Sequence, residues 1–247
     1  MTAAFTEAAQ DADIQTGETL SVLFGKIKKR LSMLKSIASN PNLLDNSNFV
    51  RRVNQRGVSG TITTAGYFID RWKRVSGSVM LSANGLQLAA GTVIAQILEY
   101  AAGTDVIASL GITAGTATAV YDNASKTYTI TATTACTLTC AKLEKGSVAT
   151  PYVPKGYGAE LAECGRYARL LRLDWQMYMG GGGTALVPLT FSEMRITPTA
   201  TFIGSPYAFN CTQAGFTLTS NGGAVNLTVT AAGATTYQAN ILLSADL

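Results

Sequence analysis

Apolar residues recur at helical spacing in one long stretch of the chain, residues 18–38. Leu20, Ile27 and Leu34 lie seven positions apart. Other apolar residues widen the same stripe, namely Leu23, Phe24, Leu31 and Ile37. A stripe of this width on a single helix has to be buried, so the helix packs either on the β region or against copies of itself. The heptad spacing favours a short coiled coil, and Pro41 ends the helix because the residue before a proline avoids the α conformation.

From Asn42 onward the chain runs in short segments separated by glycine, asparagine and aspartate, which is typical of strands joined by turns. The most regular alternation lies at 127–140, where one parity carries Tyr128, Ile130, Ala132, Cys136, Leu138 and Cys140. We predict one half-buried strand there, paired as a hairpin with 116–121. Asn221–Gly223 predicts another hairpin. The fold class is therefore mainly β, with an antiparallel jelly-roll β-sandwich and a C-terminal β-rich domain.

Two shorter segments interrupt the strands. Residues 159–168 are expected to form a short helix with Leu161 and Cys164 facing inward. The Gly180–Gly183 run is not followed by the lysine and hydroxyl residue of a phosphate loop, so we interpret it as a connection between two strands.

Composition narrows the classes of partner. Charged residues make up 14% of the chain and apolar residues 47%, which argues against disorder and for a packed core. The bases gather on the N-terminal helix instead of lining a groove, so we expect no nucleic-acid partner. No run approaches the roughly eighteen apolar residues of a membrane span, so we expect no membrane insertion. The acidic N-terminus lacks a secretion signal, so the four cysteines are expected to remain thiols in a reducing cytoplasm.

The pattern of titratable residues argues against an enzyme. The sequence contains no histidine, so a Ser-His-Asp or Cys-His arrangement cannot form within the chain. Glycoside hydrolysis uses two carboxylates about 5–10 Å apart, and the predicted strands carry no two acids at strand spacing. Cys136 and Cys140 lack the further ligands that a zinc site needs. We expect a non-enzymatic protein with no catalytic residues, metal or cofactor.

Three stretches resemble a group of bacteriophage and prophage tail proteins. NLLDNSNF (Asn42–Phe49), with GYFIDRW (Gly66–Trp72), is similar to the opening of a jelly-roll domain found in many tail fibres. KLEKGSVATPYVPKGYGAELAECGRYAR (Lys142–Arg169) resembles the closing strand and following helix of that domain. FSEMRITPTATF (Phe191–Phe202) is similar to the start of the C-terminal β region of these proteins. The chain thus resembles a tail fibre or receptor-binding protein with a carbohydrate-binding-module-like jelly roll.

The resemblance implies a homotrimer in a virion tail or tail-like particle, made and folded in the bacterial cytoplasm and used for host adhesion. Residues 1–40 would form the attachment and trimerisation helix, bound to a tail or baseplate protein. Residues 41–157 would form the jelly roll, and residues 158–247 the receptor-binding tip. The implied ligand is a bacterial cell-surface polysaccharide. The glycan, the host, the kind of particle and the presence of calcium stay open.

Several motif residues have structural explanations beside functional ones. Trp72 has the geometry to stack on a sugar, but it shares its parity with Phe68 and is better explained as core. Asp70 and Arg71 are adjacent, so they point to opposite faces of a strand and each is expected to hold a loop. Glu144 is open to a catalytic or calcium-binding role, although a single carboxylate at a strand end more often caps backbone amides.

The charge-poor C-terminal region offers aromatic faces and amides, which together suit neutral sugars. Its candidate ligand-binding residues are Trp175, Tyr178, Tyr207, Phe209 and Tyr237. We expect a shallow site near the distal end. The alternative is a purely structural tail or baseplate connector or particle decoration protein. These aromatic residues would then be buried, and the basic helix face and the acidic N-terminal residues would be the working surfaces.

Overall fold

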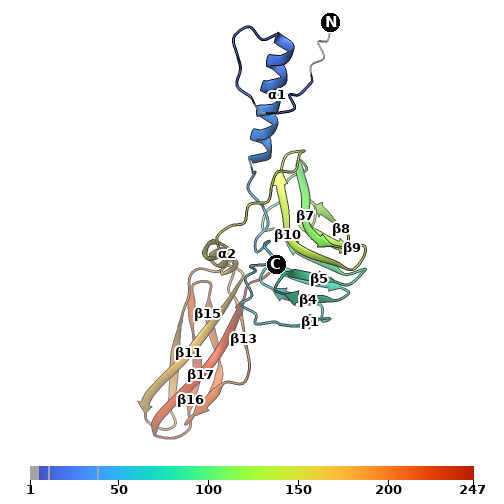
Figure 1. Cartoon of the computed structure of the whole chain (residues 1–247). Helices are drawn as coiled ribbons and strands as arrows, with labels where there is room; N and C mark the ends of the chain where they lie inside the picture. Colours follow the sequence, from blue (N-terminus) through green and yellow to red (C-terminus); the bar gives the residue numbers. More distant parts are fainter. Residues whose placement is uncertain (1–5, 11, 38) are drawn as a thin grey trace.

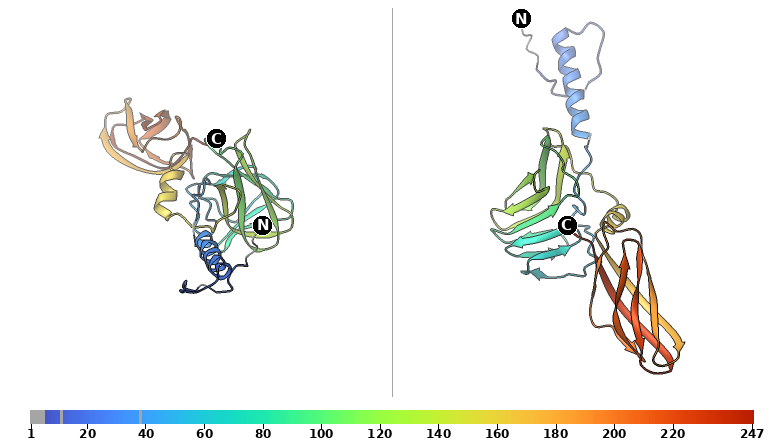
Figure 2. Two further views of the ribbon diagram at one scale, coloured as in Figure 1. Left: turned by 90° about the horizontal axis from the view of Figure 1, so that it is seen from above. Right: turned by 180° about the vertical axis from the view of Figure 1, so that it is seen from behind.

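We describe the protein from a computed structural model. It describes residues 6–10, 12–37 and 39–247, without the side chains of 32–37. Helix α1 (Leu20–Ile37) protrudes at one end of an elongated molecule, and two β regions follow it, linked by helix α2 (Tyr157–Cys164) (Figures 1 and 2). The described chain is mainly β, as the alternation predicts.

Residues 61–145 form two five-stranded antiparallel sheets, which we call the first sheet pair. One sheet has the order β1-β4-β5-β10-β7, and the other has the order β2-β3-β6-β9-β8. The strands are β1 (Thr61–Ile62), β2 (Gly66–Ile69), β3 (Trp72–Ser76), β4 (Val79–Ser82), β5 (Gly85–Leu88), β6 (Val93–Ile97), β7 (Val106–Ala114), β8 (Ala117–Asp122), β9 (Thr127–Ala132) and β10 (Cys136–Lys145).

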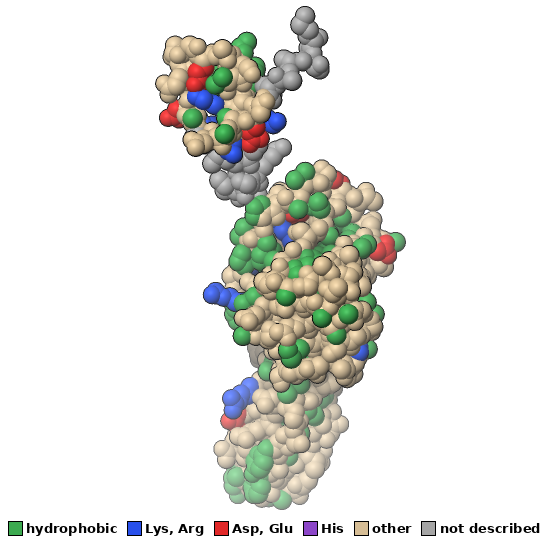
Figure 3. Space-filling view, turned by 45° about the vertical axis from the view of Figure 1, so that its right-hand side comes forward, with side chains coloured by type: hydrophobic (Ala, Val, Ile, Leu, Met, Phe, Trp, Pro, Cys, Tyr) green, Lys and Arg blue, Asp and Glu red, His purple; other side chains and the backbone are tan. Residues whose placement is uncertain are grey.

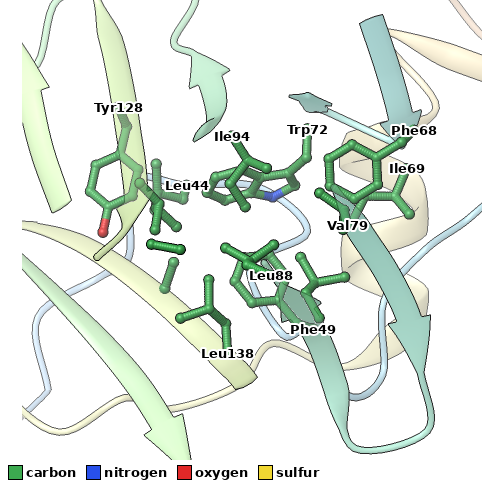
Figure 4. Packing of buried hydrophobic residues seen from close by; sticks show 14 of the residues in the cluster. Leu44, Phe49, Phe68, Ile69, Trp72, Val79, Leu88, Ile94, Tyr128 and Leu138 are labelled. Atoms are coloured by element: carbon green, nitrogen blue, oxygen red, sulfur yellow. The ribbon is translucent and has the colours of Figure 1, made fainter. Parts of the chain in front are cut away.

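Trp72 lies in the core between these two sheets (Figure 4). Its ring meets Phe49 edge-on with centroids 5.1 Å apart, and Tyr128 edge-on at 6.1 Å. The indole N–H donates to the backbone oxygen of Asn46 at 3.0 Å, so the buried ring leaves no polar atom unpaired. Trp72 and Phe68 are both buried, which confirms that they are core residues.

The prediction of one strand over 127–140 is wrong, although its hairpin with β8 is confirmed. The chain turns at residues 133–135, and β9 and β10 belong to different sheets. The backbone N–H groups of Thr133 and Thr134 donate to the oxygen of Thr116, which closes the turn. Both strands face the same core, so the alternation continues across the turn. A register shift after Leu138 then leaves Cys140 only half-buried.

Residues 168–244 form the second sheet pair. One sheet has the order β11-β17-β13, with β14 also paired to β17, and the other has the order β12-β16-β15. The strands are β11 (Ala168–Met179), β12 (Thr184–Thr190), β13 (Thr199–Phe202), β14 (Tyr207–Phe209), β15 (Cys211–Thr219), β16 (Gly222–Val229) and β17 (Gly233–Ser244). Two predicted connections are confirmed: the glycine run joins β11 to β12, and β15 and β16 form the hairpin at Asn221.

Helix α1 is confirmed, and its apolar stripe is largely open to solvent. Leu20 is 72% exposed, Phe24 45% and Leu31 54%. Leu23 and Ile27 are half-buried. The side chains of Leu34 and Ile37, which the sequence also assigns to the stripe, lie outside the described side chains. Helix α1 extends away from both sheet pairs (Figure 1), and none of the described side chains of the stripe is fully buried.

The N-terminal residues before α1 lie against its basic face. The backbone N–H of Ala8 donates to the oxygen of Gly25 at 3.1 Å. Glu18 pairs with Lys26, and Asp13 accepts from Arg30 at 2.7 Å. At 100° per residue, Lys26 lies about 120° around the helix from Leu20, whereas Arg30 lies about 80° from Leu20 and only about 20° from Leu23, at the edge of the stripe.

Asp70 and Arg71 each hold a loop, as expected, but they form the turn between β2 and β3 and not part of a strand. Arg71 has a φ of 71°, which a strand does not allow. Asp70 accepts from the backbone N–H of Gln55 at 3.2 Å. Arg71 donates to Asp45 at 2.9 Å and to the oxygen of Ile97 at 2.7 Å.

Glu144 caps a backbone amide, as the structural interpretation predicts. Its fully buried carboxylate accepts from the backbone N–H and the hydroxyl of Thr150 and pairs with Lys142 at 3.0 Å. Lys142 also donates to the oxygen of Pro151 and to Ser39. This buried pair ties the chain entering the first sheet pair to the chain leaving it.

The short helix is confirmed at 157–164, but the prediction that Leu161 faces inward is wrong. Leu161 is 37% exposed, whereas Cys164 and Glu160 are buried. Glu160 turns inward because its carboxylate accepts from the backbone N–H of Asn46 at 2.5 Å. The helix thus contacts the first sheet pair through a polar side chain that the apolar pattern does not reveal.

The two sheet pairs meet at a seam of polar contacts. Arg56 pairs with Asp246, and the Tyr67 hydroxyl donates to the backbone oxygen of Leu247 at 2.6 Å. Gln55 donates to the oxygen of Ala168 at 2.7 Å. The end of the chain therefore lies against the first sheet pair (Figure 1).

Candidate functional site

The sheet β11-β17-β14 presents one face to the core and one to solvent. Leu171, Leu173 and Trp175 of β11 pack against the core of the second sheet pair. The residues that alternate with them along β11 are exposed, namely Arg172, Asp174, Gln176 and Tyr178. Residues directly opposite in antiparallel strands share a face, so the register identifies every member of the solvent face. We call this solvent face the outer face.

Paired residues form successive rows across the outer face. Arg172 lies opposite Asn240, Asp174 opposite Gln238, Gln176 opposite Thr236 and Tyr178 opposite Ala234. Strand β14 adds Tyr207 beside Gln238 and Phe209 beside Thr236. The face thus combines a guanidinium, a carboxylate, several amides and three aromatic rings.

Three of the five predicted aromatic residues lie on this face. Tyr178 is 83% exposed, Tyr207 55% and Phe209 49%. Trp175 lies on the opposite side of β11 and is half-buried against the core. The prediction that Tyr237 contacts the ligand is wrong, because the central strand β17 directs this side chain into the core, where it is fully buried. Burial also raises the pKa of its hydroxyl.

A small polar hollow lies on the outer face beside Tyr207. It has a volume of about 220 Å³ and is lined mainly by Arg172, Asp174, Tyr207, Gln238 and Asn240. The Gln238 amide donates to Asp174 at 3.0 Å, which fixes both side chains across the strands. Fixed amide and carboxylate groups beside a ring can bind vicinal hydroxyls of a sugar through paired hydrogen bonds.

Charge disappears toward the distal end of the second sheet pair. After Asp174 the sequence has only Glu193, Arg195 and Asp246. Arg195 donates to the oxygens of Ala245 and Asp246 at the seam, far along β17 from the distal turns. The lower end of the face seen in Figure 3 shows apolar and neutral surface only.

Sequence reasoning missed the polar members Arg172, Asp174 and Asn240. A signal was present, because Arg172 and Asp174 alternate with Leu171 and Leu173 and must therefore point away from the core. The pairing of β11 with β17 and of β17 with β14 had no such signal.

Asp174 is the one carboxylate in these outer-face rows, so they lack the acid pair of a glycosidase. Among the described residues, no cluster of three or more His, Cys, Asp or Glu side chains is placed to hold a metal ion. Within the same residues, no helix combines the length and apolarity required to cross a membrane. The four cysteines are all free.

Comparison with known proteins finds no matching family model, no similar curated protein and no similar solved structure.

Proposed function

We propose that the protein is a non-enzymatic, trimeric receptor-binding protein of a phage tail or tail-like particle, and that its outer face binds a bacterial surface polysaccharide. The observation that carries the proposal is the gathering of Tyr178, Tyr207 and Phe209 with the fixed Asp174–Gln238 pair on one exposed face. Aromatic rings stack on the apolar faces of sugars, while amides and carboxylates bind their hydroxyls.

The first sheet pair supports the proposed tail-fibre architecture. Two five-stranded antiparallel sheets enclose one apolar core, as a jelly-roll β-sandwich does. We interpret this part as a rigid spacer between α1 and the second sheet pair, because both ends of the molecule extend away from it (Figure 2).

The stripe on α1 supports the trimer. Leu20 and Leu31 are more than half exposed although they share one face of the helix. Three copies that bring these faces together would bury the stripe as a parallel coiled coil. Arg30 lies at the edge of this stripe, so its ion pair with Asp13 would lie at the rim of the coiled coil.

Threefold display would strengthen a weak site. A shallow hollow of this kind binds one or two sugar units, and linking three copies raises the avidity by roughly 10²–10⁴ without any new contact. A trimer is therefore part of the binding mechanism as well as of the architecture.

A double substitution of Tyr207 and Phe209 by alanine tests the outer face. Loss of stacked rings costs on the order of 1–2 kcal/mol per ring, so we expect at least about a tenfold loss of binding per site. The measurement is binding of the full-length protein to a panel of bacterial cells and purified capsular and O-antigen polysaccharides. Tyr157→Ala is a matched control, since Tyr157 is also 55% exposed but lies on α2. Unchanged binding by a folded double variant contradicts this placement.

Substitution of Leu31 by glutamate tests the trimer. A carboxylate in the stripe would oppose association, so we expect the mass in solution to fall from three chains to one and cell binding to fall with it. Lys28→Glu on the same helix is the control for charge. A monomeric parent protein contradicts the proposal.

The alternative of a structural connector relies on the basic helix face and the acidic N-terminal residues as contact surfaces. In this chain Glu18 and Asp13 already pair with Lys26 and Arg30, so the two surfaces engage each other. This pairing favours the receptor-binding proposal over a connector that uses these charges.

A further inference from the structure

A second hollow lies at the seam, where the loop after β6 approaches the end of β10 and the segment after α2. We call it the seam pocket. It has a volume of about 340 Å³. Its polar and aromatic lining includes Asp45, Glu99, Tyr100, Lys145, Arg166 and Tyr167. None of these residues belongs to the outer face.

Two carboxylates of the seam pocket are held in fixed positions. Asp45 accepts from Arg71 at 2.9 Å, and the guanidinium of Arg71 lies 3.6 Å from the ring centre of Tyr167. Glu99 accepts from the Tyr167 hydroxyl at 2.8 Å and pairs with Arg166 at 3.0 Å. The hydrogen bond from Tyr167, together with the nearby Arg166, holds the pKa of Glu99 below its usual value.

Both carboxylates remain accessible from the pocket. The side chain of Asp45 is 22% exposed and that of Glu99 is 20% exposed. Each therefore has free acceptor capacity beyond the contacts that fix it. Oriented acceptors that need no rearrangement suit the hydroxyl groups of a saccharide.

The seam pocket has one positive charge in excess. Arg71 and Arg166 are each matched by a carboxylate, Asp45 and Glu99. Lys145 is exposed and donates to the backbone oxygen of Ala102, and it makes no ion pair with the described residues. A ligand with a single negative charge complements this arrangement.

Tyr100 supplies an aromatic surface beside these charges. It is 76% exposed although it lines the hollow, and Leu43 and Leu98 provide apolar lining nearby. A ring so exposed contributes little to the stability of the fold, which leaves it available to stack on a sugar ring.

From these observations we infer that the seam pocket binds an acidic saccharide, a uronic acid unit whose ring stacks on Tyr100 and whose carboxylate faces Lys145. Its hydroxyls donate to Asp45 and Glu99. This site is separate from the outer face, so the protein would contact a charged polysaccharide at two positions, one acidic sugar at the seam and neutral sugars further out.

Trigalacturonate and its methyl ester form a matched pair of probes, because the ester keeps the rings and removes the charge. We expect the full-length protein to bind trigalacturonate more tightly, as measured by calorimetry and ligand-observed NMR. A charge-assisted hydrogen bond contributes about 1.5–3 kcal/mol, so Lys145→Gln should weaken trigalacturonate binding about tenfold or more. The same variant should leave binding of the ester unchanged.

Tyr100→Ala should weaken binding of both probes, since both keep the sugar ring. Lys28→Gln removes the same charge from an exposed position on α1 and should change neither. Equal affinity for the two probes, or equal effects of Lys145→Gln and Lys28→Gln, overturns the inference. The Tyr207/Phe209 double variant should bind trigalacturonate normally, so failure at the seam is distinguishable from failure of the outer face.

Discussion

The two sheet pairs differ in how they use polar side chains. In the first pair and the loops around it, the buried polar residues include Asp70, Arg71, Lys142 and Glu144. In the second pair, Thr235 is the buried polar residue among the described residues, and the core is otherwise apolar or aromatic. The first pair thus fixes its loops with buried ions, whereas the second keeps its polar groups on the outer face.

This difference goes with a difference in strand length, and with what keeps each sheet pair rigid. Strands β2–β6 are only four or five residues long, and buried ion pairs with several hydrogen bonds hold the connecting loops between them. Strands β11 and β17 are twelve residues long and pair along their whole length, so the ladder itself provides rigidity. A sheet held by its own ladder leaves its solvent side free for a ligand.

The largest expected effect is in the aromatic core of the first pair. Trp72→Ala removes a fully buried ring, and such changes cost about 3–5 kcal/mol in the free energy of unfolding. Urea unfolding followed by circular dichroism measures the loss. Trp175→Ala is the comparison in the second pair, and its half-buried ring should cost less than half as much. Equal costs would contradict the proposed difference in how the two tryptophans are packed.

The next effect concerns the buried Lys142–Glu144 pair. Lys142→Met leaves Glu144 buried without its cation, which costs about 3 kcal/mol or more. Replacing both residues, with Lys142→Met and Glu144→Leu, should recover much of that loss in the same unfolding experiment. A double variant as unstable as the single one would mean that the hydrogen bonds to Thr150 and Pro151 dominate, and the pairing is secondary.

The pH dependence of this pair follows from the pKa of Glu144. Burial alone would raise that pKa, but hydrogen bonds from Thr150 and Lys142 outweigh it, so the pKa lies below the usual 4.5. The stability that the ionised carboxylate contributes is present above pH 4.5 and is lost as the pH falls through the lowered pKa.

A smaller effect of opposite sign is expected at Glu160. Burial raises the pKa of this carboxyl above its usual 4.5. Its ionised form therefore destabilises the fold at neutral pH, and this penalty disappears as the pH falls to 4.5 and below. Glu160→Gln should raise the unfolding midpoint at pH 7 and have little effect at pH 4. Glu193→Gln, at an exposed position outside this helix, should not show this pattern. A gain from Glu160→Gln that is equal at both pH values would contradict the assignment.

The sequence predicts local features well and fails where the choice between sheets matters. The parity of Tyr128 continues through Leu138 because β9 and β10 face one core, so period-two alternation cannot detect that the chain changes sheets. Glu160 faces inward through a contact with Asn46, which is distant in sequence and leaves no periodic signal.

Alternation along the strands also made part of the candidate site predictable. Trp175 shares its parity with Leu171 and Leu173, and Tyr237 shares its parity with Ile241 and Leu243, so both were identifiable as core residues. Tyr207 and Phe209 lie on a three-residue strand, too short for alternation to reveal its outward face. Their position beside Gln238 depends on strand pairing, which sequence spacing does not encode.

The smallest effect separates the two cores most directly. Tyr128 and Tyr237 are both fully buried, one in each sheet pair. The Tyr128 hydroxyl donates to the backbone oxygen of Ser109 at 3.3 Å, whereas the Tyr237 hydroxyl has no hydrogen-bond partner among the described residues. Removal of a bonded hydroxyl costs about 1 kcal/mol, so Tyr128→Phe should lower the free energy of unfolding by that amount.

Tyr237→Phe should instead be neutral or stabilising, because it removes a buried polar group that makes no hydrogen bond and keeps the ring. Urea unfolding of both variants against the parent protein measures the contrast directly. If Tyr237→Phe costs as much as Tyr128→Phe, then the Tyr237 hydroxyl has a hydrogen-bond partner in solution. The core of the second sheet pair would then contain a further bonded polar group. Since Tyr237 lies directly beneath the outer face on β17, the same variant should also leave glycan binding unchanged, which keeps the core separate from the binding surface.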